Sequence, residues 1–163
     1  MKRLYIIRHA KTDQFSKTGK DFDRELLPKG KRQMKELNRF FANYVFEKPF
    51  EIWISPAKRT QQTFNGIKKS LESSGKVVST SFPDELYLAE REQFFEKIVN
   101  HSSANDLLII GHNSGISDLA GYLTEQVVEL RTGEFIQLVF ECNEWEEISR
   151  GTAVIAYRFR PEV

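Results

Sequence analysis

Short runs of apolar residues alternate along the chain with stretches in which apolar residues recur every three or four positions. The runs predict six strands, at residues 4–7, 50–54, 77–82, 107–110, 135–140 and 152–159. The recurring positions predict helices in most of the intervening segments. Strands that alternate with helices are typical of an α/β protein with a mainly parallel sheet, so we expect this class.

Four helices are predicted from their apolar positions and from the residues at their ends. The first begins near Pro28 and Gly30. Ser55-Pro56 begins the second, because serine can cap the free amides and proline fits the first turn. Gly75 ends that helix. The residues expected to face inward are, in chain order, Met34, Leu37, Phe41 and Tyr44; Ala57, Phe64, Ile67 and Leu71; Phe94, Phe95, Ile98 and Val99; and Ile116, Leu119, Ala120 and Leu123.

Polar residues able to do chemistry follow three of the predicted strands. Arg8 and His9 come directly after the run at 4–7, and His112 follows the run at 107–110. Arg59 falls in the first turn of the helix that follows the run at 50–54. Ligands of open α/β folds bind in a crevice at the carboxyl ends of the strands. We therefore expect these four side chains to meet in one crevice.

The combination of two arginines and two histidines favours phosphoryl chemistry. Arg8 and Arg59 can hold a dianionic phosphoryl group through forked hydrogen bonds, and a helix N-terminus also favours an anion. His9 and His112 would supply a nucleophile and a partner that stabilises the transferring group. Taken alone, Arg8-His9 would be interpreted as a structural pair. A metal site is the other alternative, but zinc usually takes three or four protein ligands and flanking arginines repel a cation.

Other polar residues receive structural interpretations. Asp21 and Arg24 are expected to fix the loop after the first strand, with a substrate contact by Arg24 as the alternative. Lys11 and Ser16 could contact phosphate or a docking partner, and the sequence does not decide this. His101 lies in a polar stretch after a predicted helix and is interpreted as a solvated loop residue.

The composition is that of an ordinary globular domain. The chain has 163 residues, 40% hydrophobic and 29% charged, which fits one domain over residues 1–163. Its 24 basic and 23 acidic side chains are interspersed, which argues against a nucleic-acid surface. Lysines around 29–35 and at 68–69 are interpreted as solvated faces, docking of an acidic partner being the alternative. The single Cys142 and a first apolar run too short for a signal peptide or membrane span predict a cytoplasmic protein.

Three segments together resemble the histidine phosphatase superfamily. Leu-Tyr-Ile-Ile-Arg8-His9-Ala10-Lys11 resembles its Arg-His-Gly or Arg-His-Ala signature. Residues 55–63 are similar to its second-arginine motif, and Gly111-His112-Asn113 is similar to its second-histidine motif. The resemblance covers nearly the whole chain and implies a phosphoglycerate mutase-like fold with three αβα layers. Residues 21–26 with Gly30, and residues 84–87, are similar to the SixA-like phosphohistidine phosphatase branch.

The resemblance also implies roles for the site residues. His9 would accept the phosphoryl group, and Arg8, Arg59 and His112 would bind and neutralise its oxygens. Neither a metal nor any other cofactor is implied, because positioning and electrostatics carry most of phosphoryl transfer. Glu85 follows the third predicted strand and is the possible general acid, although its surroundings resemble the branch in which that role is weak or absent.

The leading hypothesis is a phosphatase that forms a covalent phosphohistidine intermediate and dephosphorylates phosphohistidine on a partner protein. An imidazole leaves phosphorus with less help from an acid than an alkoxide does, and short loops would leave the site open to a side chain on another protein. The alternatives are a phosphomonoesterase of small molecules and a non-catalytic phosphate-binding module. The module would be expected to have lost His9 or an arginine. We expect neither nucleic-acid nor membrane partners.

Overall fold

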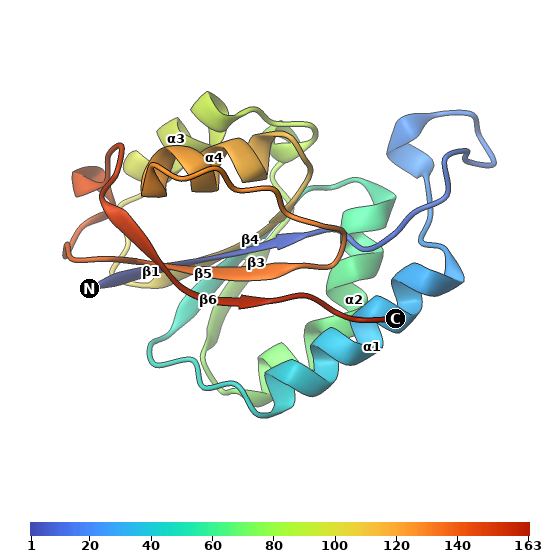
Figure 1. The fold of residues 1–163 in the computed structure, drawn as a ribbon, viewed down its shortest axis with the longest axis horizontal. Coiled ribbons are helices and arrows are strands. Elements are labelled where there is room, and N and C mark those ends of the chain that lie inside the picture. The colour runs from blue at the N-terminus through green and yellow to red at the C-terminus, as the bar shows by residue number, and fades with distance from the viewer.

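The computed structural model describes residues 1–163, and its centre is a six-stranded sheet (Figure 1). The order across the sheet is β3-β2-β4-β1-β5-β6. Strands β3, β2, β4 and β1 run parallel, whereas β5 is antiparallel to both of its neighbours. The strands are β1 (Lys2–Arg8), β2 (Phe50–Ile54), β3 (Val77–Ser81), β4 (Asp106–Gly111), β5 (Phe135–Phe140) and β6 (Ala153–Phe159). The predicted α/β class with a mainly parallel sheet is confirmed.

Helices cover both faces of this sheet, so the molecule has three αβα layers (Figure 1). On one face lie α1 (Pro28–Ala42) and α2 (Lys58–Ser73), and on the other lie α3 (Arg91–Val99) and α4 (Gly115–Thr124). Single 3₁₀ turns, η1 (Asp21–Asp23), η2 (Asp84–Leu86) and η3 (Trp145–Glu147), occur in the connections. None of the helices is both long and apolar enough to cross a lipid bilayer.

The buried apolar side chains form one cluster on each face of the sheet. Successive residues of β1 illustrate the division, because Leu4 and Ile6 point to the α3 and α4 side while Tyr5 and Ile7 point to the α1 and α2 side. Strands buried on both faces appear in the sequence as continuous apolar runs rather than alternating ones. This burial explains why the runs at 4–7 and 107–110 located β1 and β4 correctly, to within two residues at each end.

Three local expectations differ from the structure. Ser55 does not cap α2, whose N-cap position is Ala57 without a side-chain cap. The Ser55 hydroxyl contacts Nε2 of His112 and accepts only the Ala57 amide, before the helix begins, at 3.4 Å. Tyr44 lies beyond the end of α1, although its ring still packs against the core. His101 is not simply solvated, since its ring packs edge-on against Trp53 at 5.0 Å and forms a hydrogen bond with a glutamate of β2.

Candidate active site

The predicted crevice forms where the carboxyl ends of β1, β4 and β2 lie side by side. The His9 amide donates to the Gly111 carbonyl at 3.2 Å, and the Ser55 amide donates to the Ile110 carbonyl at 3.1 Å. These bonds carry the pairing of the strands one residue past their ends. After β1 the chain passes to α1 on one face, and after β4 it passes to α4 on the other. This reversal opens a crevice between the two strand ends, the position in which such folds hold ligands.

The His9 and His112 rings face each other across this crevice, with centroids 5.5 Å apart. His9 is 6% exposed and His112 is 2% exposed. The His9 Nδ1 lies 2.8 Å from the Ala10 carbonyl oxygen. Because a carbonyl can only accept, Nδ1 carries the ring proton and donates it in this bond. The other nitrogen of His9, Nε2, therefore keeps a free lone pair.

The His112 ring is oriented by Ser55. The Ser55 Oγ lies 2.6 Å from Nε2 of His112, and Nδ1 of the same ring is buried without a partner. With the serine hydroxyl donating to Nε2, Nδ1 carries the proton and can donate it to an oxygen atom in the crevice. A neutral His112 of this tautomer complements the neutral His9, one ring presenting a donor and the other a lone pair.

Both imidazoles are held in the neutral form. Burial, assisted by the nearby Arg59 and Arg8 and opposed by a hydrogen bond to Ala10, lowers the pKa of His9 to about 4. Burial also lowers the pKa of His112 to about 3, assisted by Arg59 and by His9 itself. Two rings that would be partly protonated near pH 6.5 in an unfolded chain are thus uncharged in the folded protein down to acidic pH.

Stability should therefore fall with acidification in a window set by these two residues. Between about pH 6.5 and 4 the unfolded chain binds protons on His9 and His112 while the folded protein does not. Stability contributed by this difference is fully present above pH 6.5 and is lost as the pH falls toward 4. Urea unfolding at pH 7 and pH 5 should differ by roughly 2 kcal/mol for each histidine. A double variant, His9→Asn with His112→Asn, should lose most of this difference, and an unchanged difference would contradict the assignment.

Arg8 and Arg59 each have a buried guanidinium nitrogen without a hydrogen-bond partner. Arg59 is 2% exposed, and its Nη1 and Nη2 donate to the backbone carbonyl and the carboxylate of Asp21 at 2.8 and 3.0 Å. Arg8 donates through Nη1 to the Leu130 carbonyl at 3.0 Å. The Nε atoms of both arginines are buried and have no partner. Together with the free Nδ1 of His112, these N–H groups make the crevice a binding site for an anion rich in oxygen.

Asp21 is a site residue that the sequence interpretation missed. Its carboxylate accepts hydrogen bonds from Arg59, Arg24 and Tyr87, and the Tyr87 ring packs edge-on against His112 at 5.8 Å. Burial favours a higher pKa, but the Tyr87 and Arg59 bonds outweigh it and lower the pKa of Asp21 to about 2. A buried arginine needs a counter-charge when no ligand is bound. A search for the carboxylate that pairs with Arg59, among the acidic residues of the loop after His9, could therefore have identified Asp21.

The Asp21–Tyr87 hydrogen bond also corrects the expectation of an open site. It joins the loop between β1 and α1 to the segment that follows η2, beside the His112 ring. That loop spans residues 9–27 and is not short. The low exposure of His9 and His112 agrees with this partial cover.

Glu85 is not brought together with the other four residues. Its carboxylate forms an ion pair with Lys97 at 2.7 Å and, together with Trp53 and His101, lines a separate hollow beside α3. The hydrogen bond from Lys97 lowers the pKa of Glu85. The candidate acid is thus held in its ionised form and faces α3.

Of the remaining loop residues, Arg24 and Ser16 make their side-chain contacts within the loop. Arg24 donates to Asp21, to the Thr12 hydroxyl and to the Asp13 carbonyl, which fixes the loop in the way expected for it. The Ser16 hydroxyl donates to the Lys20 carbonyl. Lys11 is exposed and forms no ion pair, while its amide donates to a glutamine of α1. No group of three or more His, Cys, Asp or Glu side chains is placed to hold a metal ion.

Glycines at two positions allow backbone to pack against backbone around the crevice. A Cβ at Gly30 would lie 2.2 Å from the Lys11 carbonyl oxygen, which is the acceptor for the amide of Leu27. A Cβ at Gly115 would lie 1.9 Å from the Ala89 carbonyl oxygen. These contacts are shorter than any side chain tolerates, so only glycine permits them. They hold the loops that carry His9, His112 and Tyr87 in their present positions.

Comparison with known families gives one match, in the N-terminal part of the chain. Residues 4–81 match the model of the histidine phosphatase superfamily (branch 1). This range contains Arg8, His9, Asp21 and Arg59 but stops before His112. Curated protein sequences yield no significant match.

Solved structures of phosphatases share the fold over almost the entire chain. A candidate phosphohistidine phosphatase SixA from Agrobacterium tumefaciens matches with a TM-score of 0.80 and 18% identity, covering 98% of each chain. The protein histidine phosphatase SixA complexed with tungstate gives 0.72 and 16%, covering 98% of this chain and 97% of its own. A candidate α-ribazole-5'-phosphate phosphatase from Escherichia coli gives 0.65 and 14%, covering 95% of each chain. At these identities the likeness establishes the phosphoglycerate mutase-like fold.

Proposed function

We propose that the chain is a member of the histidine phosphatase superfamily, whose model matches residues 4–81, and that it hydrolyses phosphohistidine on a partner protein through a covalent intermediate on His9. Membership of this superfamily would make it a hydrolase that removes phosphoryl groups by way of a histidine, and the proposed reaction needs no metal. The proposal adds the roles of the individual residues and the chemical class of the substrate. It also places the protein in the cytoplasm, where the lone Cys142 would remain reduced.

The observation that carries the proposal is the set of three buried nitrogens without partners. The Nε atoms of Arg8 and Arg59 and the Nδ1 of His112 are buried without partners. Both arginines lie close enough to the His9 ring to lower its pKa, and the His112 ring lies 5.5 Å from that of His9. Buried donors are nearly always paired in folded proteins, so unpaired donors at one place indicate a missing acceptor. A phosphoryl group supplies three oxygens with negative charge, which matches three free N–H donors in number and in sign.

The reaction follows from the free lone pair of His9. Nε2 attacks phosphorus in line with the leaving group, forming an N–P bond to the enzyme as the bond to the substrate nitrogen breaks. The proton stays on Nδ1, which donates it to the Ala10 carbonyl, and this hydrogen bond keeps the ring correctly oriented. Arg8, Arg59 and His112 stabilise the charge on the equatorial oxygens. Water then attacks the phosphohistidine of the enzyme, which releases inorganic phosphate and restores His9.

The acidic side chains support a substrate with an N–P bond. Glu85 is ionised and paired with Lys97, and Asp21 has a pKa of about 2. Neither carboxyl holds a proton to give to a leaving alkoxide at neutral pH. The imidazole of a phosphohistidine whose other nitrogen is protonated leaves as a neutral ring and needs no further proton. The structural likeness to SixA proteins, which is greater than the likeness to the α-ribazole-5'-phosphate enzyme, points in the same direction.

Hydrolysis of two substrate classes by wild type and Glu85→Gln tests the proposal. A phosphohistidine peptide and an aryl phosphate would be compared at neutral pH, with inorganic phosphate release as the readout. We expect a strong preference for the phosphohistidine peptide and no effect of Glu85→Gln, because Glu85 faces Lys97 and not the crevice.

Two other outcomes would contradict the proposal in different ways. Preference for the ester, with activity lost in Glu85→Gln, would make Glu85 the general acid and the protein a phosphomonoesterase. Hydrolysis of neither substrate would leave a phosphate-binding module on this fold. Circular dichroism of both proteins provides the control for folding.

A further inference from the structure

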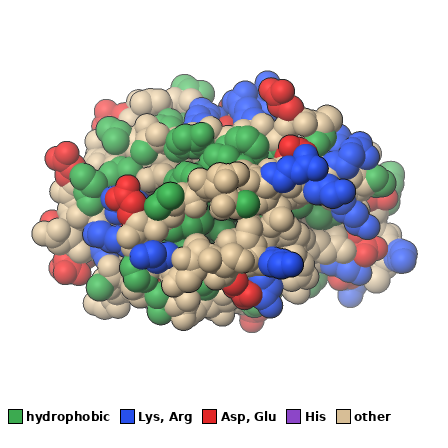
Figure 2. All heavy atoms as spheres, turned by 90° about the horizontal axis from the view of Figure 1, so that it is seen from below, with side chains coloured by type: hydrophobic (Ala, Val, Ile, Leu, Met, Phe, Trp, Pro, Cys, Tyr) green, Lys and Arg blue, Asp and Glu red, His purple; other side chains and the backbone are tan.

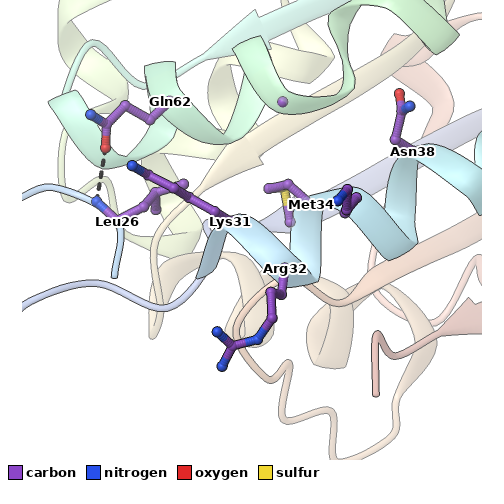
Figure 3. A pocket seen from close by; sticks show the side chains of 8 residues that line it. Leu26, Lys31, Arg32, Met34, Asn38 and Gln62 are labelled. Carbon is purple, nitrogen blue, oxygen red and sulfur yellow. Dashed lines mark hydrogen bonds between the residues drawn. The ribbon is translucent and has the colours of Figure 1, made fainter. Parts of the chain in front are cut away.

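A groove runs between α1 and α2 on the face of the molecule below the sheet (Figure 3). Its volume is about 340 Å³, and the buried side chains of Leu26 and Met34 contribute its apolar surface. The absence of a side chain at Gly66 lets the two helices approach closely at its base, where a Cβ would lie 2.8 Å from Met34. We call this feature the basic groove, and its walls include Lys31, Lys35, Asn38 and Gln62.

The groove has a strong excess of positive charge. Lys31 and Lys35 are one helical turn apart on α1, and neither has a carboxylate within ion-pair distance. Figure 3 shows Lys31 extended toward α2, while Arg32 points away from α2 and adds to the charge at the outer edge. Figure 2, which views this side of the molecule, shows Lys and Arg side chains gathered toward one end. The Asn38 Oδ1 in the groove wall is buried without a hydrogen-bond partner.

The groove begins beside the candidate active site. Gln62 follows Arg59 by three residues on α2, roughly 5 Å along the helix axis, and Gly66 follows by seven, roughly 10 Å. Gln62 accepts the amide of Leu26 at 2.8 Å, and Leu26 pairs with Thr12 in the loop that follows His9. An extended peptide covers about 3.3 Å per residue, so a substrate whose phosphohistidine occupies the crevice reaches the groove within about three to six residues.

We propose that the basic groove docks an acidic segment of the phosphohistidine-bearing protein and thereby selects the substrate. This inference rests on the proposed function. The carboxylates of such a segment would meet Lys31 and Lys35, and an apolar side chain would cover Leu26 and Met34. The net charge of the whole chain is only +1, so the protein as a whole would attract an acidic segment weakly. The unpaired lysines are gathered in the groove, and the attraction should therefore be strongest there. Complementary charges of this kind mainly increase the rate of association and the specificity for one partner.

Two synthetic peptides provide the test. Both carry one phosphohistidine, and the following six residues include three glutamates in one peptide and three glutamines in the other. The wild-type protein should show a KM about tenfold lower for the acidic peptide at low ionic strength, with equal kcat. Lys31→Glu with Lys35→Glu should remove this preference or reverse it. The preference of the wild-type protein should also shrink at high salt, because the side chains are exposed.

A matched variant separates docking from net charge. Lys48→Glu with Lys76→Glu changes the charge by the same amount at the amino ends of β2 and β3, the opposite edge of the sheet from the crevice. It should retain the tenfold preference. Equal KM values for both peptides with the wild-type protein would overturn docking while leaving the proposed function intact. Hydrolysis of neither peptide would instead refute the proposed function. Stronger competition by a single-stranded oligonucleotide than by the unphosphorylated acidic peptide would overturn the assignment of a protein partner.

Discussion

Replacing His9 with asparagine is expected to abolish turnover while leaving the protein folded. Asparagine keeps a donor that can reach the Ala10 carbonyl, but it has no lone pair equivalent to Nε2. Removing a nucleophile that acts with a set of partners costs on the order of 10⁶ in kcat. The measurement is phosphate release from a phosphohistidine peptide, with urea unfolding to show that the variant is as stable as the wild type near neutral pH.

Trapping of the intermediate distinguishes a nucleophile from a binding residue. Wild type quenched during turnover should carry an alkali-stable, acid-labile phosphoryl group, and His9→Asn should carry none. His112→Asn is the matched control, because it removes a stabilising donor and leaves the His9 lone pair in place. It should still form the phosphoenzyme, only more slowly. Wild-type turnover in His9→Asn would remove the covalent mechanism.

Replacing Arg59 with lysine is expected to lower kcat by about 10²–10³, although the charge is retained. Lysine has no planar fork, so it cannot hold Asp21 with two nitrogens and direct a third N–H into the crevice. The loss of one donor aimed at the transferring group costs about 3–4 kcal/mol of transition-state stabilisation. Single-turnover kinetics would locate the loss in the chemical step rather than in product release.

Asp21→Asn serves as the companion to Arg59→Lys. It keeps the shape of the side chain and removes the charge that faces Arg59. The Arg59 guanidinium then keeps its own charge and N–H donors but is positioned less firmly. We expect a smaller decrease in kcat, about tenfold. Equal activities of wild type and Arg59→Lys would show that the guanidinium fork does not act on the phosphoryl group. The melting temperature of each variant controls for loss of the buried ion pair.

Much of the architecture could be predicted from the sequence because burial leaves a simple pattern. β1 and β4 are covered on both faces, so each appears as an unbroken apolar run that ends where the polar site begins. The positions of Arg8, His9 and His112 followed from those ends. The direction of β5 did not, because a run of apolar residues has the same pattern in either orientation.

The contacts that hold the site together could not be predicted in the same way. Ser55 orients His112 across 57 positions of sequence, and Asp21 reaches Arg59 and Tyr87 from the single 3₁₀ turn η1 in the loop between β1 and α1. Such pairs depend on which strands become neighbours, and local periodicity contains no information about that. The role of Ser55 was misassigned because the Ser-Pro pair also fits a helix cap, a local interpretation that tertiary contacts overrode.

The contact between Gly115 and the Ala89 carbonyl bears on attempts to redesign this protein. A loop graft at residues 87–89, the obvious way to change which substrates enter, would move a backbone that lies directly against the start of α4, three residues after His112. Such a graft must reproduce the path of the main chain at Ala89 and not only its side chains. Changes at Lys31 and Lys35 are less constrained, because these residues line the groove with exposed side chains and can be replaced without moving the main chain.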